Sequence, residues 1–461
     1  MLWSHAMDMP RQRPPLGPPQ GPPQGPPQAV AKPLRRRGAL ELVMGSRLGK
    51  LLGRIGVAPR LASSDGLLDL AGALLSLRGR ASGPALASAF FDLYEASDIA
   101  ERQAFLAKLH ALYPRDAAAI DLAIARWKEA RDESAAQALN DASESPCLKL
   151  INMLNLAPSG TMRLLAMRTD LLGTPRGNAG LKALDAEFEA AFTAWFNAGF
   201  LEMRRIGWDS PAAVLEKIIQ YEAVHSIAGW DDLRGRVEPV DRRCYGFFHP
   251  QMPDEPLIFV EVALTSALPG AIGDILSKTR RTVNPRKASH AIFYSISNCQ
   301  EGLRGIPFGN FLIKRVVGLL QAELPQLKTF ATLSPLPGFA DWLKTEQGDK
   351  AKLPSDGQLR ALAARYLVVA RSARGQVIDS VARFHLGNGA RLEAIHSGAD
   401  PSANGLRQSH GVMVNYVYDL AEIEANHFQL AELGTVPASK AVLTLAGVEV
   451  AKDAKAGKKA A

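Results

Sequence analysis

The chain has 461 residues, of which 47% are hydrophobic and 22% are charged, so it can bury a sizeable core and is long enough for two domains. This composition excludes a wholly disordered chain, and no run of about 18 apolar residues predicts a membrane-spanning helix. The three cysteines lie far apart and form no CxxC pair. This spacing argues against a disulfide framework and a cysteine-bound zinc ion, and it favours a reducing compartment.

The net charge of +8 comes from the two ends of the chain. Residues 1–38 carry +5 and residues 451–461 carry +3, so residues 39–450 are neutral overall. A nucleic-acid-binding protein needs a basic face on its folded body. The charge distribution therefore argues against a nucleic-acid partner.

Residues 1–38 are predicted to form an extended, solvated tail. They contain three tandem GPPQ repeats, whose period of four excludes a collagen helix with its glycine at every third position. We find no apolar core of a secretory signal. The arginines 35–37 leave an organelle transit peptide open, although the proline content argues against the amphipathic helix that such peptides form. Residues 451–461 are predicted to be a second, basic and flexible tail without a peroxisomal tripeptide. We therefore expect a cytoplasmic location.

Residues 39–200 are predicted to form a helical domain, because leucine and alanine recur there at three- and four-residue spacing. The clearest stripe has one large apolar residue per turn: Leu184, Phe188, Phe192, Phe196 and Phe200. An aromatic stripe of this kind is typical of a core or a subunit interface rather than of a cofactor site. We expect an all-helical bundle that can assemble subunits.

Residues 201–450 are predicted to form a second domain of mixed α/β structure. A helix is expected over 214–224, and a longer one over 311–324. Short β-rich runs alternate with such helical stretches, at 257–264, 291–297, 327–333 and 413–420. This alternation favours an α+β multidomain protein, in which a helical bundle precedes a domain with a mixed sheet.

The most informative local unit is the loop that joins the run 291–297 to the helix that follows. It contains Gly302, Gly305 and Gly309. Glycine lets a backbone approach a ligand closely, and the first N–H groups of the helix point into such a loop. The unit is a candidate site for a phosphate or pyrophosphate, to which Arg304 can add a charged contact.

The type of anion site is narrowed by what the loop lacks and by what it resembles. It has neither the GxxxxGK[ST] of a P-loop nor the GxGxxG of a dinucleotide-binding fold. The spacing Arg304-Gly305-x-x-x-Gly309-Asn310 is similar to the coenzyme A loop of the GNAT acetyltransferase superfamily, with Pro307 where a middle glycine is usual. An ordinary strand-to-helix turn explains the glycines equally well.

Ser334 and His385 are candidate catalytic residues, and each has a structural alternative. Ser334 precedes a rigid Pro- and Gly-containing turn, where a hydroxyl can serve a site or cap the next helix. His385 lies near the Asn388-Gly389 turn and can exchange a proton near neutral pH, although a lone histidine is more often structural. No HExxH or other metal-binding spacing occurs, and no GxSxG surrounds Ser334, so we expect no metal and no α/β-hydrolase site.

Taken together, these segments resemble the malonyl-CoA decarboxylase family. Similar blocks occur in the family's order from Leu164 onward and include RRIGWDSPAAVLEKIIQYEAVH, AIFYSISNCQEGLRGIPFGNFLIKRVV, LSPLPGF, FHLGNGA and GVMVNYVYDL. The resemblance implies a helical domain followed by a GNAT-like catalytic domain. It also implies a carboxy-lyase of fatty acid metabolism that converts malonyl-CoA to acetyl-CoA and CO2, forms a homotetramer and uses no cofactor beyond the coenzyme A of its substrate.

The resemblance also implies roles for individual residues. The catalytic serine and histidine fall on Ser334 and His385. Residues implied to bind coenzyme A or to line the pocket are Arg304, Gly305, Ile306, Pro307, Phe308, Gly309, Asn310, Ser295 and Tyr418. Lys217 matches a family lysine, for which we expect a structural role.

Two departures from the family pattern stand out. The family's Asn-Trp pair downstream of the histidine is replaced in the segment 394–397, which reads AIHS. Ala212 stands where some members carry a cysteine that joins two subunits. We therefore expect no redox-controlled cross-link at that point.

The expected reaction passes through a thioester enolate. Loss of CO2 leaves negative charge on the thioester oxygen, so the thioester is its own electron sink. Ser334 is expected to bind the carboxylate or the thioester oxygen, and His385 to protonate the carbanion carbon. The alternatives are a GNAT-type acyltransferase that uses the same loop, and a helical assembly scaffold with a degenerate catalytic domain.

Overall fold

The computed structural model of the protein describes residues 64–175, 179–197, 199–306, 311–348 and 354–448. These residues belong to one compact unit of the chain, Val57–Ala461. Both predicted tails and the start of the predicted helical domain lie outside the described residues. The domain limits of 39–200 and 201–450 therefore stay predictions.

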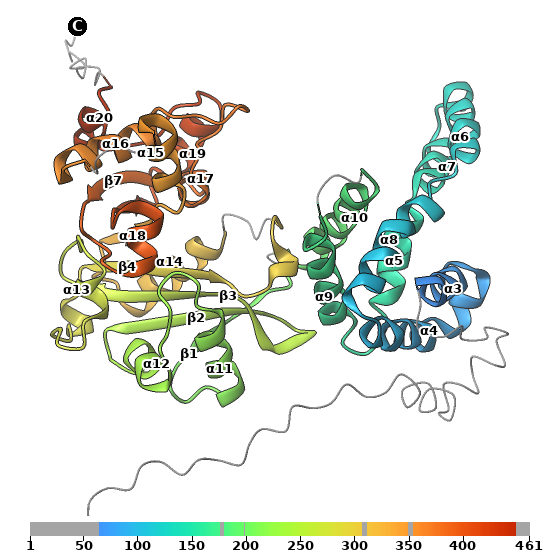
Figure 1. Ribbon diagram of the computed structural model, residues 1–461, viewed down its shortest axis with the longest axis horizontal. Helices are drawn as coiled ribbons and strands as arrows, with labels where there is room; N and C mark the ends of the chain where they lie inside the picture. Colours follow the sequence, from blue (N-terminus) through green and yellow to red (C-terminus); the bar gives the residue numbers. More distant parts are fainter. Residues whose placement is uncertain (1–63, 176–178, 198, 307–310, 349–353, 449–461) are drawn as a thin grey trace, which may run out of the picture. The chain divides into compact units, whose positions relative to one another are not determined.

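The first described part of the chain is helical (Figure 1). Its helices are α3 (Ser64–Leu75), α4 (Leu77–Ala96), α5 (Ile99–Leu112), α6 (Ala117–Ala130), α7 (Glu133–Ser143), α8 (Pro146–Leu154), α9 (Gly160–Leu172) and α10 (Ala179–Trp195). Several begin where a side chain caps a free backbone N–H group. Asp98 forms a capping box with Glu101 at the start of α5, and Asp116 and Asp132 cap α6 and α7.

The aromatic stripe of α10 forms part of the core of this helical part. Phe192 packs against Phe188 and Phe196 with ring centroids 5.6 and 5.7 Å apart, and all three are buried together with Leu184. Phe200 is 56% exposed, because the helix ends at Trp195 and the spacing of one residue per turn no longer applies. The expectation of a core stripe is thus confirmed for four positions but not for Phe200, and the alternative of a subunit interface stays a prediction.

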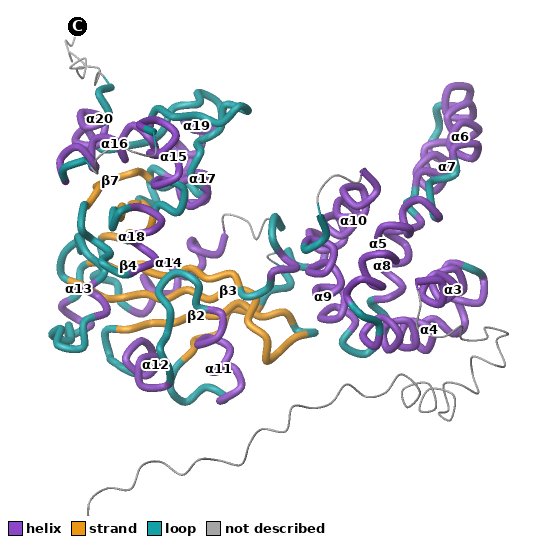
Figure 2. Tube along the Cα trace, in the orientation of Figure 1, coloured by secondary structure: helices purple, strands orange, loops and turns teal. Residues whose placement is uncertain are grey.

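The second part of the chain is built on a mixed sheet, whose strands Figure 2 shows in orange. The strands are β1 (Glu202–Ile206), β2 (Arg242–His249), β3 (Met252–Thr265), β4 (His290–Asn298), β5 (Thr329–Thr332), β6 (Ser334–Pro335), β7 (Arg391–His396) and β8 (Met413–Tyr418). Their order in the sheet is β1-β2-β3-β4-β5-β8-β6, and β7 also pairs with β8. The β4–β5 pair is parallel and the others are antiparallel, which confirms the mixed sheet.

Helices cover this sheet. One face of β2 and β3 is covered by α11 (Ala212–Tyr221) and α12 (Trp230–Val237), whose apolar residues form a core cluster with Phe248 and Phe259 (Figure 1). The remaining helices are α13 (Gly273–Leu276), η1 (Pro285–Lys287), η2 (Glu301–Leu303), α14 (Phe311–Glu323), α15 (Phe339–Gln347), α16 (Asp356–Val368), α17 (Ser380–Gly387), α18 (Ala403–Ser409), α19 (Ile423–Ala431) and α20 (Lys440–Leu445). Within the described ranges, no helix has the length and apolar character needed to cross a bilayer.

Three local features of this part position the site. The register between β3 and β4 shifts after Glu261, so Tyr294 has no partner across the strands and forms a bulge. The chain leaves β5 at Thr332 and enters β6, where Ser334 pairs with Val414 of β8. The Asp379 side chain caps the N-terminus of α17.

Candidate active site

The fold brings Ser334 and His385 together, although they are 51 positions apart in the chain. The Ser334 Oγ atom, on β6, lies 3.1 Å from the His385 Nε2 atom, on α17. The His385 Nδ1 atom lies 2.8 Å from the hydroxyl of Tyr418, at the end of β8. All three side chains are buried. Three residues singled out from the sequence therefore form one chain of hydrogen bonds.

The hydrogen-bond pattern determines which nitrogen of His385 carries the proton. The Ser334 hydroxyl donates to Thr332 Oγ1 at 2.9 Å, which uses its single hydrogen. Ser334 can then only accept from His385, so Nε2 carries the N–H. Nδ1 accepts from the Tyr418 hydroxyl, which stays protonated because burial raises the pKa of Tyr418 well above its ordinary value.

Burial also sets the charge of His385. Removal from water lowers the pKa of this histidine to about 3, so the ring is neutral at pH 7. The Tyr416 ring stacks on the imidazole with centroids 4.7 Å apart and helps to exclude water. The pKa of His385 thus lies well below the near-neutral value that its residue type suggests, because burial disfavours the charged imidazolium.

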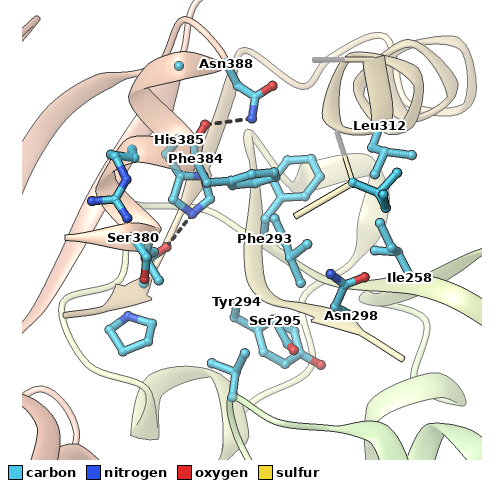
Figure 3. Close-up of a pocket in the computed structure, with 18 residues that line it drawn as sticks. Ile258, Phe293, Tyr294, Ser295, Asn298, Leu312, Ser380, Phe384, His385 and Asn388 are labelled. Carbon is cyan, nitrogen blue, oxygen red and sulfur yellow. Dashed lines mark hydrogen bonds between the residues drawn. The ribbon is translucent and has the colours of Figure 1, made fainter. Parts of the chain in front are cut away.

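Ser334 and His385 open into a cavity of about 470 Å³ (Figure 3). The residues that line it are Val224, Ile258, Phe293, Tyr294, Ser295, Ile296, Asn298, Ile306, Leu312, Ser334, Pro335, Ser380, Val381, Arg383, Phe384, His385, Gly387 and Asn388. Most of this wall is apolar, and among the described residues that line it Arg383 alone carries a permanent charge. Its Nη1 atom donates to the carbonyls of Val377 and Ile378, at 2.7 and 2.6 Å. The cavity is therefore a poorly solvated space with a few polar groups in its wall, as small-molecule sites usually are.

Ser295 lines this cavity, but its hydroxyl is engaged with the protein. It donates to the Glu222 carboxylate, with oxygen distances of 2.8 and 2.7 Å. That carboxylate also accepts from Ser297 Oγ at 3.0 Å and from the N–H of His225 at 2.8 Å. Ser295 therefore contributes to the wall of the cavity, and Glu222 holds it in place.

The candidate coenzyme A loop is described as far as Ile306, and Pro307, Phe308, Gly309 and Asn310 lie outside the described residues. Ile306 lines the main cavity. Gly305 has a φ of +84°, a conformation that favours glycine. The Arg304 guanidinium is half exposed and pairs with Glu301 at 2.6 Å. This surface ion pair can exchange for a ligand phosphate at little cost.

The start of this loop is fixed against α9. Arg168 is fully buried, and its Nη1 atom donates to the Gly302 carbonyl at 2.8 Å. The same guanidinium pairs with Asp185 and Glu189 of α10, at 2.8 and 3.1 Å. A second cavity, of about 600 Å³, is lined by Arg304 and Gly305 together with residues of α9 and α10. The described start of the loop thus borders two cavities through residues 304–306, and Arg168 of α9 holds it at Gly302.

Other sequence-derived positions lie away from the main cavity. Lys217 forms an ion pair with Glu255 on α11 and β3 and does not line the cavity. The segment 394–397 lies at the end of β7, where His396 Nε2 approaches Asn415 Oδ1 at 2.6 Å, and none of its residues lines the cavity. Among the described residues, no group of three His, Cys, Asp or Glu side chains could hold a metal ion.

Sequence reasoning missed several residues that support the site. Tyr416 and Glu222 reach the predicted residues from distant elements, whereas Thr332 and Asp379 lie close in sequence to Ser334 and His385. A Thr-x-Ser pattern at the end of a strand was the one local signal, because residues i and i+2 lie on the same face of an extended chain.

The chain matches family models along most of its length. The model described as the malonyl-CoA decarboxylase N-terminal domain matches residues 113–196, and that of the C-terminal domain matches residues 199–356 and 354–458. Mitochondrial malonyl-CoA decarboxylase of the goose Anser anser anser is 36% identical over 347 residues, which are 64% of this chain and 68% of that protein. The mouse protein of the same name is 34% identical over 346 residues, 64% of this chain and 70% of its own length.

Solved structures agree with these matches. The crystal structure of malonyl-CoA decarboxylase from Rhodopseudomonas palustris is 46% identical, with a TM-score of 0.77, and covers 83% of this chain and 99% of its own. That from Cupriavidus metallidurans is 37% identical, with a TM-score of 0.64 and the same coverage. The resemblance found in the sequence is confirmed, and the chain belongs to the malonyl-CoA decarboxylase family of carboxy-lyases.

Proposed function

We propose that this chain converts malonyl-CoA to acetyl-CoA and CO2 through a thioester enolate formed in the main cavity. The observation that carries the proposal is the hydrogen-bonded chain of Ser334, His385 and Tyr418, of which Ser334 and His385 line a largely apolar cavity. The proposal is also supported by the family to which the chain belongs, because the relatives named above are malonyl-CoA decarboxylases.

The character of the cavity suits loss of CO2. A malonyl carboxylate that enters it leaves water, and Arg383 is already engaged with two backbone carbonyls. A localised carboxylate is therefore poorly stabilised, whereas in the transition state the charge moves into the thioester as the carboxylate becomes neutral CO2. The breaking C–C bond gives its electron pair to the thioester, and the oxygen becomes an enolate.

Two donors are available for that oxygen and for the carbon. A hydrogen-bond donor at a developing oxyanion typically contributes ~3–4 kcal/mol to transition-state stabilisation. The Ser334 hydroxyl can turn from Thr332 to the enolate oxygen, and the His385 Nε2–H can then protonate the carbon. Tyr418 keeps its proton because burial raises its pKa, and its hydrogen bond to Nδ1 stabilises the negative charge that the departing proton leaves on the imidazole. Solvent then returns one proton to the site, which balances the reaction.

The glycine loop is proposed to hold the coenzyme A portion. Ile306 borders the main cavity, and Arg304 and Gly305 border the second, so a ligand that follows the loop can reach both. The thioester is the only electron sink that this reaction needs. We therefore expect turnover without an added metal or cofactor, and no loss of activity in a chelator.

The test is incubation of the full chain with malonyl-CoA labelled in the free carboxylate, without an acceptor. We expect labelled CO2 and acetyl-CoA in equal amounts, and a large loss of both in Ser334→Ala and His385→Ala. Acyl transfer to an added amine without CO2 release would support the acyltransferase alternative instead. Absence of coenzyme A binding would support the scaffold alternative.

Three further expectations accompany this function. We propose a role in fatty acid metabolism, a homotetrameric assembly and a cytoplasmic location. The curated relatives above are named as mitochondrial proteins, so the location needs imaging of the tagged full chain. Light scattering of the purified protein tests the tetramer.

A further inference from the structure

The two catalytic elements are joined by a buried carboxylate. Asp379, directly before α17, is 1% exposed. Its Oδ1 atom accepts from the N–H groups of Val381 and Ala382, at 3.0 and 2.9 Å, and so caps the helix that carries His385. Its Oδ2 atom accepts from the Gly338 N–H at 3.4 Å and from the Tyr366 hydroxyl at 3.2 Å. The two oxygens therefore serve two different elements.

Gly338 ends the short segment that begins with Ser334. Two prolines stiffen this segment, so the position of Gly338 restricts that of Ser334. A Cβ atom at Gly338 would lie 2.6 Å from the Tyr366 hydroxyl, which shows how closely the three groups approach. The Tyr366 ring packs against Phe339 and Trp342, with ring centroids 5.6 and 5.1 Å away.

We propose that Asp379 and Tyr366 are positioning residues, which set the distance between Ser334 and His385 without touching the substrate. The cavity-lining residues include neither of them, although Ser380 and Val381, next to Asp379, line it. The expected effect on turnover rests on the proposed function. A displacement of about 1 Å between reacting groups can lower a rate by about 100-fold.

Asp379→Asn separates the two roles of the carboxylate. The amide oxygen can still cap α17, while the amide nitrogen faces the Gly338 N–H, and two donors cannot bond to each other. Tyr366→Phe removes the second donor without altering the cap. We expect kcat to fall by about 10- to 100-fold in Asp379→Asn and less in Tyr366→Phe, with KM for malonyl-CoA within about 3-fold of wild type in both.

The matched control is Asp132→Asn, at the helix cap of α7, where Oδ1 accepts from Ala135 N–H at 2.7 Å. This variant makes the same chemical change away from the site and is expected to leave kcat unchanged. Near-normal kcat in both Asp379→Asn and Tyr366→Phe would overturn the proposal. If Asp379→Asn fails to fold, Tyr366→Phe alone decides it.

A second readout is independent of turnover. Ring ¹⁵N signals of the histidines report the tautomer and hydrogen bonds of His385, whose signal is identified by its loss in His385→Gln. We expect this signal to shift in Asp379→Asn and Tyr366→Phe but not in Asp132→Asn. An unchanged signal would contradict the positioning role. Wild-type protein that releases no CO2 would contradict the proposed function and leave this spectroscopic test intact.

Discussion

Tyr418→Phe tests whether a second hydrogen bond holds His385 in its reactive form. The substitution removes the hydroxyl that donates to Nδ1 at 2.8 Å and leaves the ring shape unchanged. Nδ1 is then a buried acceptor without a donor, which costs about 1–3 kcal/mol. Without the Tyr418 donor, the tautomer with its proton on Nδ1 is no longer disfavoured, because the Ser334 hydroxyl can then donate to Nε2, and Nε2 has no proton to give to the substrate.

This cost translates into a rate. If the reactive tautomer loses about 1–3 kcal/mol, turnover falls by about 5- to 150-fold. We would measure kcat from acetyl-CoA formation at saturating malonyl-CoA, and stability from urea unfolding. Tyr113→Phe is the matched control, since its hydroxyl donates to the Leu68 carbonyl at 3.1 Å in the helical part. The control should lose some stability and keep its kcat. A Tyr418→Phe variant with kcat within about 2-fold of wild type would refute this reasoning.

Three further predictions follow from burial and packing. Burial lowers the pKa of His385 from 6.5 to about 3, so the unfolded chain binds more protons than the folded chain between these pH values. The free energy of unfolding should therefore fall as the pH drops below 6.5, by about 2 kcal/mol at pH 5. Urea unfolding of wild type and His385→Gln at several pH values checks this, and a difference in stability between the two that does not change with pH would contradict it. The pH profile of kcat/KM should show no inflection from this histidine between pH 5 and 7. Arg168→Gln should destabilise the protein by about 3 kcal/mol and raise KM for malonyl-CoA, because it removes the buried guanidinium from its ion-pair partners. The control Arg102→Gln, at a partly exposed ion pair, should cost less than about 1 kcal/mol, and equal losses of stability in the two variants would contradict this. Gly302→Ala places a Cβ atom 2.3 Å from a backbone carbonyl oxygen of α9 and should cost about 1–3 kcal/mol of stability. Gly318→Ala lies in open space within α14 and should stabilise the protein by up to about 1 kcal/mol. Thermal unfolding that ranks the two variants in the opposite order would refute the packing argument.

Local sequence patterns predicted much of the fold. The runs at 257–264, 291–297, 327–333 and 413–420 fall on β3, β4, β5 and β8, and the helices expected near 214 and 311 are α11 and α14. Strands β1, β2 and β7 were not predicted. Their sequences, EMRRI, RRCYGFFH and RLEAIH, mix charged with apolar residues, and they are stabilised by pairing and packing with distant elements.

The sequence alone determined which residue types were available for chemistry and in what order. Ser334, His385 and the glycines of the loop were recognisable because turn residues and family blocks are local properties of the chain. Their arrangement was decided by tertiary structure: the tautomer and charge of His385 depend on Thr332, Tyr418 and burial, which no local pattern encodes. Hydrogen bonds and loss of solvent act over a few ångströms in space, and residues far apart in the chain meet at that distance only after the sheet and its helices have packed.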